Sequence, residues 1–317
     1  MRVAVTGASG FIGGEILKRV VPGGGVWALF RSRGERSSSW EERGCRIVLG
    51  DLDDTRALAR LLAGAEVVYH SAAAMGKGDP AASRRVNVVG TENLVRAAIE
   101  AGVSRFVYLS SISVYAATRL PGQTITEEIE PEHTDRLNAY GSTKYAGELA
   151  VRRLAGECGM PFTIIRPTNV YGPGSGPWFA AFERMLRKLP VAIGDIPIDV
   201  VYVDDLVEAI VQAGTSPRGA NQVFHIGHEM VSMNRFILEV ARVTGQRAWA
   251  LPRVVDRAVR HGINRGYRIA TGKHMSMSLV RPALYPHTKA ANTFGYAPAI
   301  ALADGFDRLT RWYRYGR

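Results

Sequence analysis

The chain of 317 residues is long enough to bury a large core, and its 46% hydrophobic and 22% charged residues are typical of a water-soluble globular protein. No apolar run approaches the ~20 residues of a membrane span, and the first predicted strand begins at Val3, so no signal peptide and a cytoplasmic location are expected. The net charge of +11 arises in residues 242–317, where it suits an anionic substrate, an acidic lipid surface or a solvated face. Without a recognisable binding module, a nucleic-acid partner is not expected. The two cysteines, Cys45 and Cys158, are expected to be buried free thiols, and no metal site is expected.

The first predicted strand, residues 3–5, runs into a glycine-rich turn and then a helix. Gly7 permits the tight turn, Gly10 lets a pyrophosphate approach the backbone, and Gly13 lets the helix pack on the strand. The N–H groups at the start of a helix attract an anion. In this strand, turn and helix context we expect a dinucleotide phosphate held by Gly7, Ser9, Gly10, Phe11, Ile12 and Gly13.

Val26–Phe30 is the second predicted strand, and it is followed by Arg31 and Arg33. Dinucleotide-binding folds usually place an acid here for the hydroxyls of the adenosine ribose. An arginine suits a 2′-phosphate instead, so NADP is favoured as cofactor and NAD is the alternative.

The third and fourth predicted strands are residues 46–50 and Val67–His70, with a helix over 54–62 between them. Asp51, followed by Leu52, is placed to accept a hydrogen bond from the adenine amine. After the fourth strand, the small residues Ser71, Ala72 and Ala73 let a cofactor ribose approach closely. His70 is predicted to be a packed residue at the strand end rather than a catalytic one.

The alternation of strands and helices continues through the next hundred residues. A helix is predicted over 87–101, and strands over 106–109 and 162–166. This order indicates an α/β fold built on a doubly wound parallel sheet, the Rossmann arrangement. Ligands of such sheets bind at the carboxyl ends of the strands, where five candidate residues fall: Gly7, Arg31, Asp51, Ala72 and Ser111.

A helix predicted over 140–157 opens with Tyr140 and Lys144, which lie four residues apart and so share a face. An ammonium about 4 Å from the tyrosine hydroxyl, at an effective dielectric of ~20, favours the phenolate by at most ~4 kcal/mol, or about three pKa units. This brings the pKa of Tyr140 from ~10 towards neutrality. Ser111 would hydrogen-bond the substrate oxygen while a hydride passes between substrate and nicotinamide. We therefore expect Ser111, Tyr140 and Lys144 to be the catalytic residues.

Beyond residue 168 the alternation loosens, with strands predicted over 200–203 and 223–226 and a helix over 204–214. Residues 1–168, completed by about 200–228, are expected to form an NAD(P)-binding domain. Residues 169–199 and 229–317 are expected to form a smaller substrate-binding lobe at the carboxyl-terminal side.

Taken in order, eight segments resemble an extended short-chain dehydrogenase/reductase of the NAD-dependent epimerase/dehydratase type. They are residues 6–13, 50–52, 70–73, 87–91, 109–115, 140–144, 166–167 and 201–206, and the resemblance covers nearly the whole chain. It implies that Tyr140 is the acid/base, that Lys144 binds the ribose and lowers the pKa of the tyrosine, and that Ser111 orients a carbonyl. It also implies cofactor contacts for Asn87, Pro167, Asn169 and Val170, and substrate contacts for Ser111, Ser113 and Asn169.

Two classes of enzyme share these features. Sugar-nucleotide epimerases usually carry an arginine just before residues 203–206, and residues 193–199 contain none. The short lead into Val200 and residues 285–296 resemble the ketoreductase branch related to dihydroflavonol reductases and 3β-hydroxysteroid dehydrogenases. Asn169 and residues 171–174 suit a sugar-nucleotide enzyme equally well. The favoured function is an NAD(P)-dependent oxidoreductase acting on a ketone or secondary alcohol. The alternatives are an NDP-sugar epimerase or dehydratase with tightly bound NAD, and a dinucleotide-sensing protein without catalysis.

Residues 253–269 predict a basic amphipathic helix, a type that can lie on a membrane surface. Its apolar side carries Val255, Val259, Ile263 and Tyr267, and its basic side carries Arg253, Arg257, Arg260 and Arg268. A rim of the substrate cleft that binds a phosphate group fits the same pattern. The resemblance further implies a homodimer formed through the helices that begin near Asn87 and Tyr140.

Overall fold

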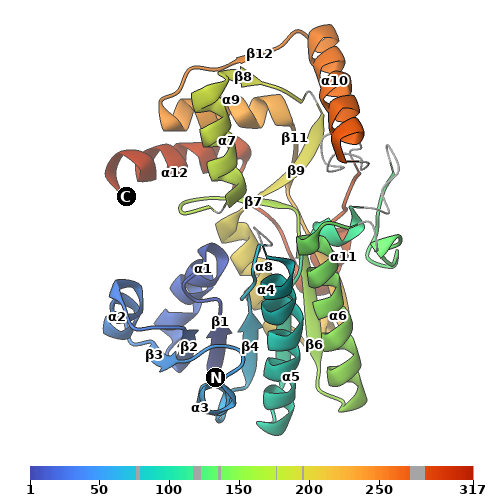
Figure 1. Ribbon diagram of the computed structural model, residues 1–317. Coiled ribbons are helices and arrows are strands. Elements are labelled where there is room, and N and C mark those ends of the chain that lie inside the picture. The colour runs from blue at the N-terminus through green and yellow to red at the C-terminus, as the bar shows by residue number, and fades with distance from the viewer. Residues whose placement is uncertain are drawn as a thin grey trace.

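The computed structural model describes residues 1–75, 79–116, 123–134, 137–175, 177–194, 196–271 and 283–316, without the side chains of 177–178, 260, 263–264 and 266–271. A parallel seven-stranded sheet forms its centre, in the order β10-β6-β5-β4-β1-β2-β3 (Figure 1). The strands are β1 Val3–Thr6, β2 Val26–Phe30, β3 Arg46–Leu49, β4 Val67–His70, β5 Arg105–Leu109, β6 Phe162–Pro167 and β10 Gln222–Ile226. The strand order reverses between β1 and β4, and open α/β sheets bind ligands at such a switch point.

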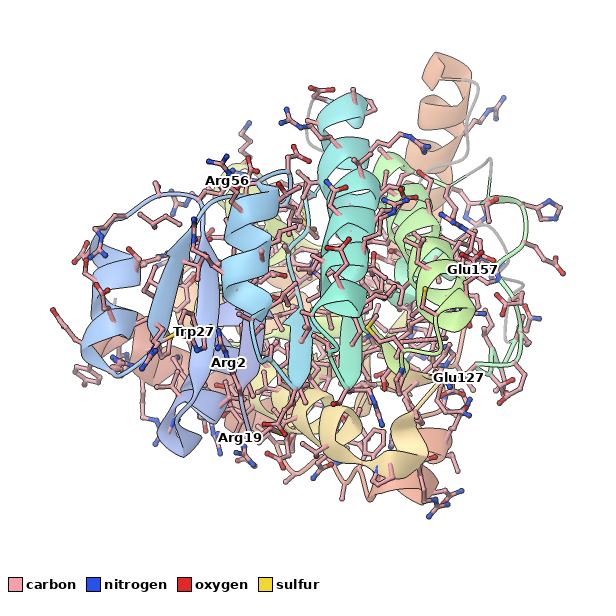
Figure 2. All side chains as sticks on the ribbon, turned by 90° about the horizontal axis from the view of Figure 1, so that it is seen from below. Arg2, Arg19, Trp27, Arg56, Glu127 and Glu157 are labelled. Carbon is pink, nitrogen blue, oxygen red and sulfur yellow. The ribbon has the colours of Figure 1, made fainter. Side chains whose placement is uncertain are left out.

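Successive residues of β1 face opposite sides of the sheet, and each side is buried by its own helices. Val3 and Val5 belong to a core with α1 and α8, whereas Ala4 belongs to a core with α3, α5 and α6. Figure 2, seen from below, shows helices on both sides of the sheet. Arg19 of α1 forms an ion pair of 2.8 Å with Glu208 of α8 and so joins the two helices of the first side. The helices are α1 Phe11–Val20, α2 Glu35–Glu42, α3 Thr55–Leu62, α4 Pro80–Arg84, α5 Gly90–Glu100, α6 Ala139–Glu157, α8 Val203–Thr215 and α11 Thr288–Phe294.

Two helical segments differ from the sequence predictions. The helix predicted over 87–101 begins earlier, because a π-helical turn over Arg85–Val89 joins α4 to α5. Helix α2 was not predicted at all, since its sequence, Glu-Arg-Ser-Ser-Ser-Trp-Glu-Glu, has no apolar period. Helix α2 places Arg36 near the glycine turn.

A second group of elements starts where β6 ends, at the carboxyl edge of the central sheet (Figure 1). It contains a three-stranded sheet in the order β11-β9-β7 and a strand pair of β8 with β12. The strands are β7 Asn169–Tyr171, β8 Val191–Ala192, β9 Pro197–Tyr202, β11 Glu229–Ser232 and β12 Trp249–Ala250, and the helices are α7 Pro177–Lys188, α9 Met233–Thr244, α10 Arg253–Thr271 and α12 Leu302–Tyr315. Strands β7 and β11 were not predicted, because each is short and is defined by pairing with distant β9. That this group forms a separate substrate-binding lobe remains a prediction.

The predicted basic helix is formed as α10. Its first turns expose Val254 by 82% and Val255 by 46%, while Asp256 is buried and accepts a hydrogen bond of 2.6 Å from the backbone N–H of Gly194. The side chains of Arg260, Ile263, Tyr267 and Arg268 lie outside the described residues. Contact with a membrane surface and binding of an anionic group therefore both remain predictions.

Within the described ranges, no helix has the length and apolar character required to cross a bilayer. Cys45 is buried, as predicted, but Cys158 is exposed. That prediction was wrong because Cys158 follows the last residue of α6, Glu157, at a surface end of the helix.

Candidate active site

The turn between β1 and α1 requires two of its glycines. Gly7 has φ +74°, and a Cβ there would lie 2.5 Å from the backbone nitrogen of Ala72. A Cβ at Gly13 would lie 2.1 Å from the carbonyl oxygen of Gly7, so only glycine lets α1 pack on the strand end. Helix α1 starts after Gly10 without a side-chain cap, so no capping side chain occupies its first N–H groups, which suits the binding of an anion. This cradle fits a dinucleotide phosphate, and contacts of Ser9, Phe11 and Ile12 with it remain predictions.

At the end of β4, His70 is buried and joined to Thr6 Oγ1 at 2.6 Å and to Thr91 Oγ1 at 2.9 Å. Burial, together with the charge of Lys144, lowers the pKa of His70 to about 3, so its imidazole is neutral. Its predicted packing role is confirmed. Ser71 donates to the carbonyl oxygen of Thr6 at 2.8 Å, and the backbone of Ser71 and Ala72 lies beside Gly7 of the turn. A cofactor contact of Ser71, Ala72 and Ala73 stays a prediction.

Asn87 is fully buried and uses its side-chain amide within the protein. Its Nδ2 donates to the carbonyl oxygen of Ala74 and to Thr143 Oγ1, both at 2.9 Å, and its Oδ1 accepts from the N–H of Ala74 at 2.7 Å. Asn87 thus holds the segment after β4 against α6. Its implied contact with a cofactor stays a prediction.

The expected adenosine side of the site contains three arginines. Arg33 forms an ion pair of 2.7 Å with Glu41 of α2, whereas Arg31 is exposed and has no hydrogen bond or ion pair within the described residues. Arg36, which sequence reasoning missed, reaches from α2 to donate to the carbonyl oxygen of Ser9 at 2.7 Å. The sequence of α2 has no apolar period, so no pattern predicts a helix that carries Arg36 to this place.

Asp51 and Leu52 follow β3 at the same edge. Asp51 is exposed and accepts a hydrogen bond of 2.9 Å from the N–H of Asp53. Leu52 is buried, and a Cβ at Gly90 would lie 2.8 Å from it. Asp51 thus stays a candidate for the adenine amine, and Leu52 packs the start of α5.

The structure brings Ser111 and Tyr140 together. Ser111 follows β5 and accepts from the N–H of Ser113 at 3.1 Å, at the start of a 3₁₀ helix over Ile112–Tyr115. A Cβ at Gly141 would lie 2.8 Å from the carbonyl oxygen of Ser113, so this glycine lets α6 begin directly against that segment. Here the hydroxyls of Ser111 and Tyr140 share a hydrogen bond. Lys144 lies one turn further along α6, buried, with its Nζ 4.1 Å from the centre of the Tyr108 ring.

The expected depression of the Tyr140 pKa is not found. Burial raises the pKa of Tyr140 to about 12, and the hydrogen bond from Ser111 lowers it only in part. Burial also lowers the pKa of Lys144 to about 7, against the attraction of Glu148. Loss of water disfavours both the phenolate and the ammonium, a cost that the helical spacing of the two residues does not reveal.

The predicted substrate contact of Asn169 falls where β6 passes into β7. Pro167 and Val170 are buried there, and Asn169 Nδ2 donates to the carbonyl oxygen of Asp199 at 2.8 Å. Ser113 Oγ is buried and has no hydrogen-bond partner among the described residues, which suits a substrate contact.

Sequence reasoning missed the Asp199 carboxyl beside Asn169. Burial raises the pKa of Asp199 to about 7, although the N–H of His228 and the hydroxyl of Thr168 hydrogen-bond it. Among the described residues, no group of three or more His, Cys, Asp or Glu side chains is placed to hold a metal ion.

Known proteins similar to this chain include epimerases and dehydrogenases. The model of the NAD dependent epimerase/dehydratase family matches residues 3–227. A UDP-glucose 4-epimerase of Vibrio cholerae is 32% identical over 263 residues, which cover 79% of this chain and 78% of that protein. A 3 beta-hydroxysteroid dehydrogenase/Delta 5→4-isomerase of Mycobacterium tuberculosis is 32% identical over 348 residues, covering 98% of this chain and 90% of that protein. The solved structure of MoeE5 in complex with UDP-glucuronic acid and NAD matches with a TM-score of 0.78 and 25% identity, covering 100% of both chains.

Proposed function

Because the chain belongs to the NAD-dependent epimerase/dehydratase family of extended short-chain dehydrogenases/reductases, we propose that it is an NAD(P)-dependent oxidoreductase acting on a ketone or secondary alcohol. The observation that carries this proposal is the hydrogen-bonded pair of Ser111 and Tyr140, with Lys144 one turn away. The pair follows a strand end of the same sheet edge as the glycine turn, which is where a substrate carbonyl and a dinucleotide would meet.

The roles of the three side chains follow from their protonation. With a pKa of about 12, Tyr140 holds its proton at neutral pH, so its Oη donates that proton to the substrate oxygen during reduction. Ser111 Oγ orients the same oxygen, and Lys144 Nζ binds the cofactor ribose. The bound nicotinamide supplies or accepts the hydride.

Replacing Tyr140 by Phe tests this assignment. The variant should lose turnover by at least about 100-fold, the lower range of general acid–base catalysis, while its Kd for dinucleotide stays within about twofold. Persistent turnover would contradict the mechanism. Turnover in the unmodified protein that is lost in this variant would also contradict the alternative of a dinucleotide-sensing protein, because such a protein catalyses no reaction.

For the cofactor, NADP remains our proposal, with Arg31 and Arg36 as the ligands of its 2′-phosphate. Arg31 has no competing partner among the described residues, and Arg36 already lies over the glycine turn. Arg33, which was expected to bind the 2′-phosphate together with Arg31, forms an ion pair with Glu41. Fluorescence titration should therefore show weaker NADPH binding for Arg31→Ala and Arg36→Ala, unchanged NADH binding, and no change of either for the control Arg33→Ala. Equal effects of all three substitutions would refute the assignment.

A sugar-nucleotide epimerase or dehydratase is the second candidate, favoured by the likeness to the Vibrio cholerae enzyme and to MoeE5. Such an enzyme regenerates its cofactor in each turnover and retains it. Absorbance and mass spectra of the small molecules released from freshly purified, denatured protein separate the two functions. Stoichiometric NAD would favour the epimerase and argue against a 2′-phosphate site. Protein that releases no dinucleotide and binds NADPH more tightly than NADH would favour the reductase, to be followed by a screen of carbonyl substrates, including anionic ones.

The proposed oligomer is a homodimer through α5 and α6, which contact each other in the structure. Leu149 of α6 is 47% exposed and Val89, just before α5, is 44% exposed, and a second copy would cover both. Light scattering should give twice the chain mass of 34.5 kDa. Leu149→Glu should then give the monomer mass without loss of helix content.

A further inference from the structure

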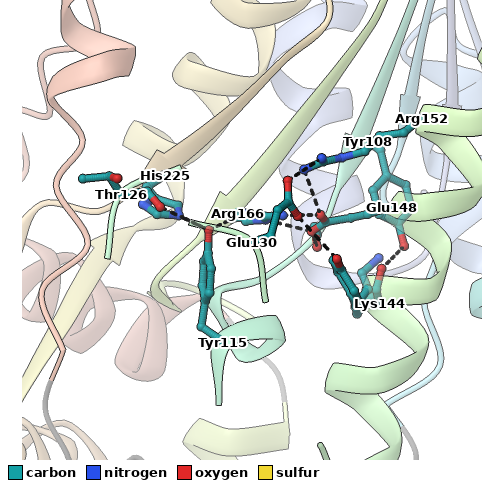
Figure 3. A network of polar contacts seen from close by, with 11 residues as sticks. Tyr108, Tyr115, Thr126, Glu130, Lys144, Glu148, Arg152, Arg166 and His225 are labelled. Atoms are coloured by element: carbon teal, nitrogen blue, oxygen red, sulfur yellow. Dashed lines mark hydrogen bonds and ion pairs between the residues drawn. The ribbon is translucent and has the colours of Figure 1, made fainter. Parts of the chain in front are cut away.

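A buried arginine lies beneath the catalytic residues. Arg166 of β6 is fully buried, and its guanidinium reaches two elements at once (Figure 3). On one side Nε donates to Glu148 Oε1 at 3.0 Å and Nη2 to Glu148 Oε2 at 2.5 Å. On the other side Nη1 donates to the hydroxyl of Tyr115. The proposed hydride chemistry uses none of these groups.

Each partner of Arg166 stands next to a catalytic residue. Glu148 lies one turn after Lys144 on α6, and it also accepts a hydrogen bond from Ser110, the residue before Ser111. Tyr115 ends the 3₁₀ helix that begins beside Ser111. One guanidinium therefore connects the helix that carries Tyr140 to the segment that carries Ser111.

The connection is rigid because it is buried and charged. The side chains of Arg166 and Glu148 are both 0% exposed, and the planar guanidinium fork fixes the direction of each contact. Tyr115 is held in turn by His225 Nε2 at 3.3 Å and by the rings of His225 and Tyr285, whose centres lie 5.5 and 5.9 Å away. A displacement of Tyr115 would thus be transmitted to Ser111 through a single turn of 3₁₀ helix.

We propose that Arg166 and Tyr115 are positioning residues that set the contact between Ser111 and Tyr140. The inference rests on the proposed function of that pair. A general acid must lie within hydrogen-bond reach of its target, and errors of about 1 Å cost on the order of 100-fold in rate. A purely structural arginine would affect unfolding but would leave this contact unchanged.

The test compares Tyr115→Phe with Tyr145→Phe. Both substitutions remove one tyrosine hydroxyl close to α6, but the hydroxyl of Tyr145 donates to Glu130 at 3.3 Å and takes no part in the contacts of Arg166. The chain of 317 residues is labelled with ¹³C at Cζ of its 12 tyrosines, and the Tyr140 resonance, which reports the hydrogen bond of its hydroxyl, is assigned from Tyr140→Phe. Tyr115→Phe should move that resonance, and Tyr145→Phe should leave it in place.

Kinetics supply the second readout, with the substrate found in the carbonyl or sugar-nucleotide assays. Tyr115→Phe should lower kcat by about 10- to 100-fold, while KM and the Kd for NADPH change by less than about twofold. Arg166→Lys, which keeps the charge but loses the fork, should move the Tyr140 resonance in the same way. An unmoved resonance with unchanged kcat, or equal changes in Tyr145→Phe, would overturn the proposal. Failure of the proposed function would show separately, as absent dinucleotide binding in the unmodified protein, and the resonance would still decide whether Tyr115 positions Tyr140.

Discussion

Gly13 is the position where the glycine turn between β1 and α1 tolerates least change. A Cβ in Gly13→Ala would lie 2.1 Å from the carbonyl oxygen of Gly7, so backbone must move and the phosphate cradle opens. We expect Gly13→Ala to destabilise the protein by ~1–3 kcal/mol and to abolish dinucleotide binding, measured by urea denaturation and NADPH titration.

Gly14→Ala is the matched control in the same helix. Its Cβ would be 3.8 Å from the nearest atom, the carbonyl oxygen of Ala8, so it should bind NADPH normally and gain up to ~1 kcal/mol from better helix propensity. Similar losses of binding in both variants would show that helix α1, not the close approach at Gly13, sets the effect.

Because of Lys144, the free energy of unfolding should change with pH between about 7 and 10.5. Its folded pKa of about 7 lies below the ordinary value of 10.5, so between these values the unfolded chain holds a proton that the folded chain has released. Wild-type stability therefore rises with pH across this window, by up to ~1.4 kcal/mol per pH unit. Lys144→Met should be more stable than wild type at pH 7, and urea denaturation should show the difference shrinking towards pH 10. A constant difference would contradict the low pKa.

Single residues could be predicted where their chemistry is local. The spacing of Gly7 and Gly13 predicts the glycine turn and the need for glycine at both positions. The spacing of Tyr140 and Lys144 alone predicts that they share a helix face. The pKa of Tyr140 could not be predicted, because it depends on how much water the fold removes. Arg36 and Asp199 were missed for a related reason, since each approaches the site through contacts distant in sequence.

At the scale of elements, α6 and β6 are joined by the buried ion pair of Glu148 and Arg166. Glu148→Leu would leave the Arg166 charge buried without its partner and should cost ~3–5 kcal/mol, measured by urea denaturation. The double variant Glu148→Leu/Arg166→Met removes both charges and should recover most of that loss. If the losses of stability in the single variants Glu148→Leu and Arg166→Met simply add in the double variant, the two charges are not coupled as described.

Strands β2 and β4 agree with their predicted bounds, since short apolar runs between turn residues mark buried parallel strands. Strand β7 has only three residues, and β11, with the sequence Glu-Met-Val-Ser, contains no apolar run like those of β2 and β4. These strands exist because β9 pairs with both, and such pairing is a property of the tertiary fold.

For the whole molecule, two buried histidines should weaken the fold in acid. Burial lowers the pKa of His70 and of His225 from 6.5 to about 3. Below pH 6.5 the unfolded chain therefore binds two protons that the folded chain does not bind. Stability is therefore lost as pH falls from about 6.5 to 3. Asp199 opposes this loss, because its raised pKa of about 7 lets the folded chain take up a proton between pH 7 and 3.8.

Asp199→Asn should thus lose stability more steeply than wild type between pH 6.5 and 4, as urea denaturation at several pH values can measure. At pH 8 the same variant should be at least as stable as wild type, since it no longer buries a carboxylate. Parallel pH profiles of the two proteins would contradict the raised pKa of Asp199.

The sheet class and the order of its elements followed from the sequence, because alternating strand and helix patterns allow few topologies. The position of β10 beside β6 was expected only as a completion of the domain. The pairing of β6 with β10 has a consequence during synthesis. After β6 has left the ribosome, residues 168–221 must be synthesised before β10 can pair with the edge of β6. At ~5–20 residues per second this takes roughly 3–11 s, during which an unpaired strand edge is available to other nascent chains and to chaperones.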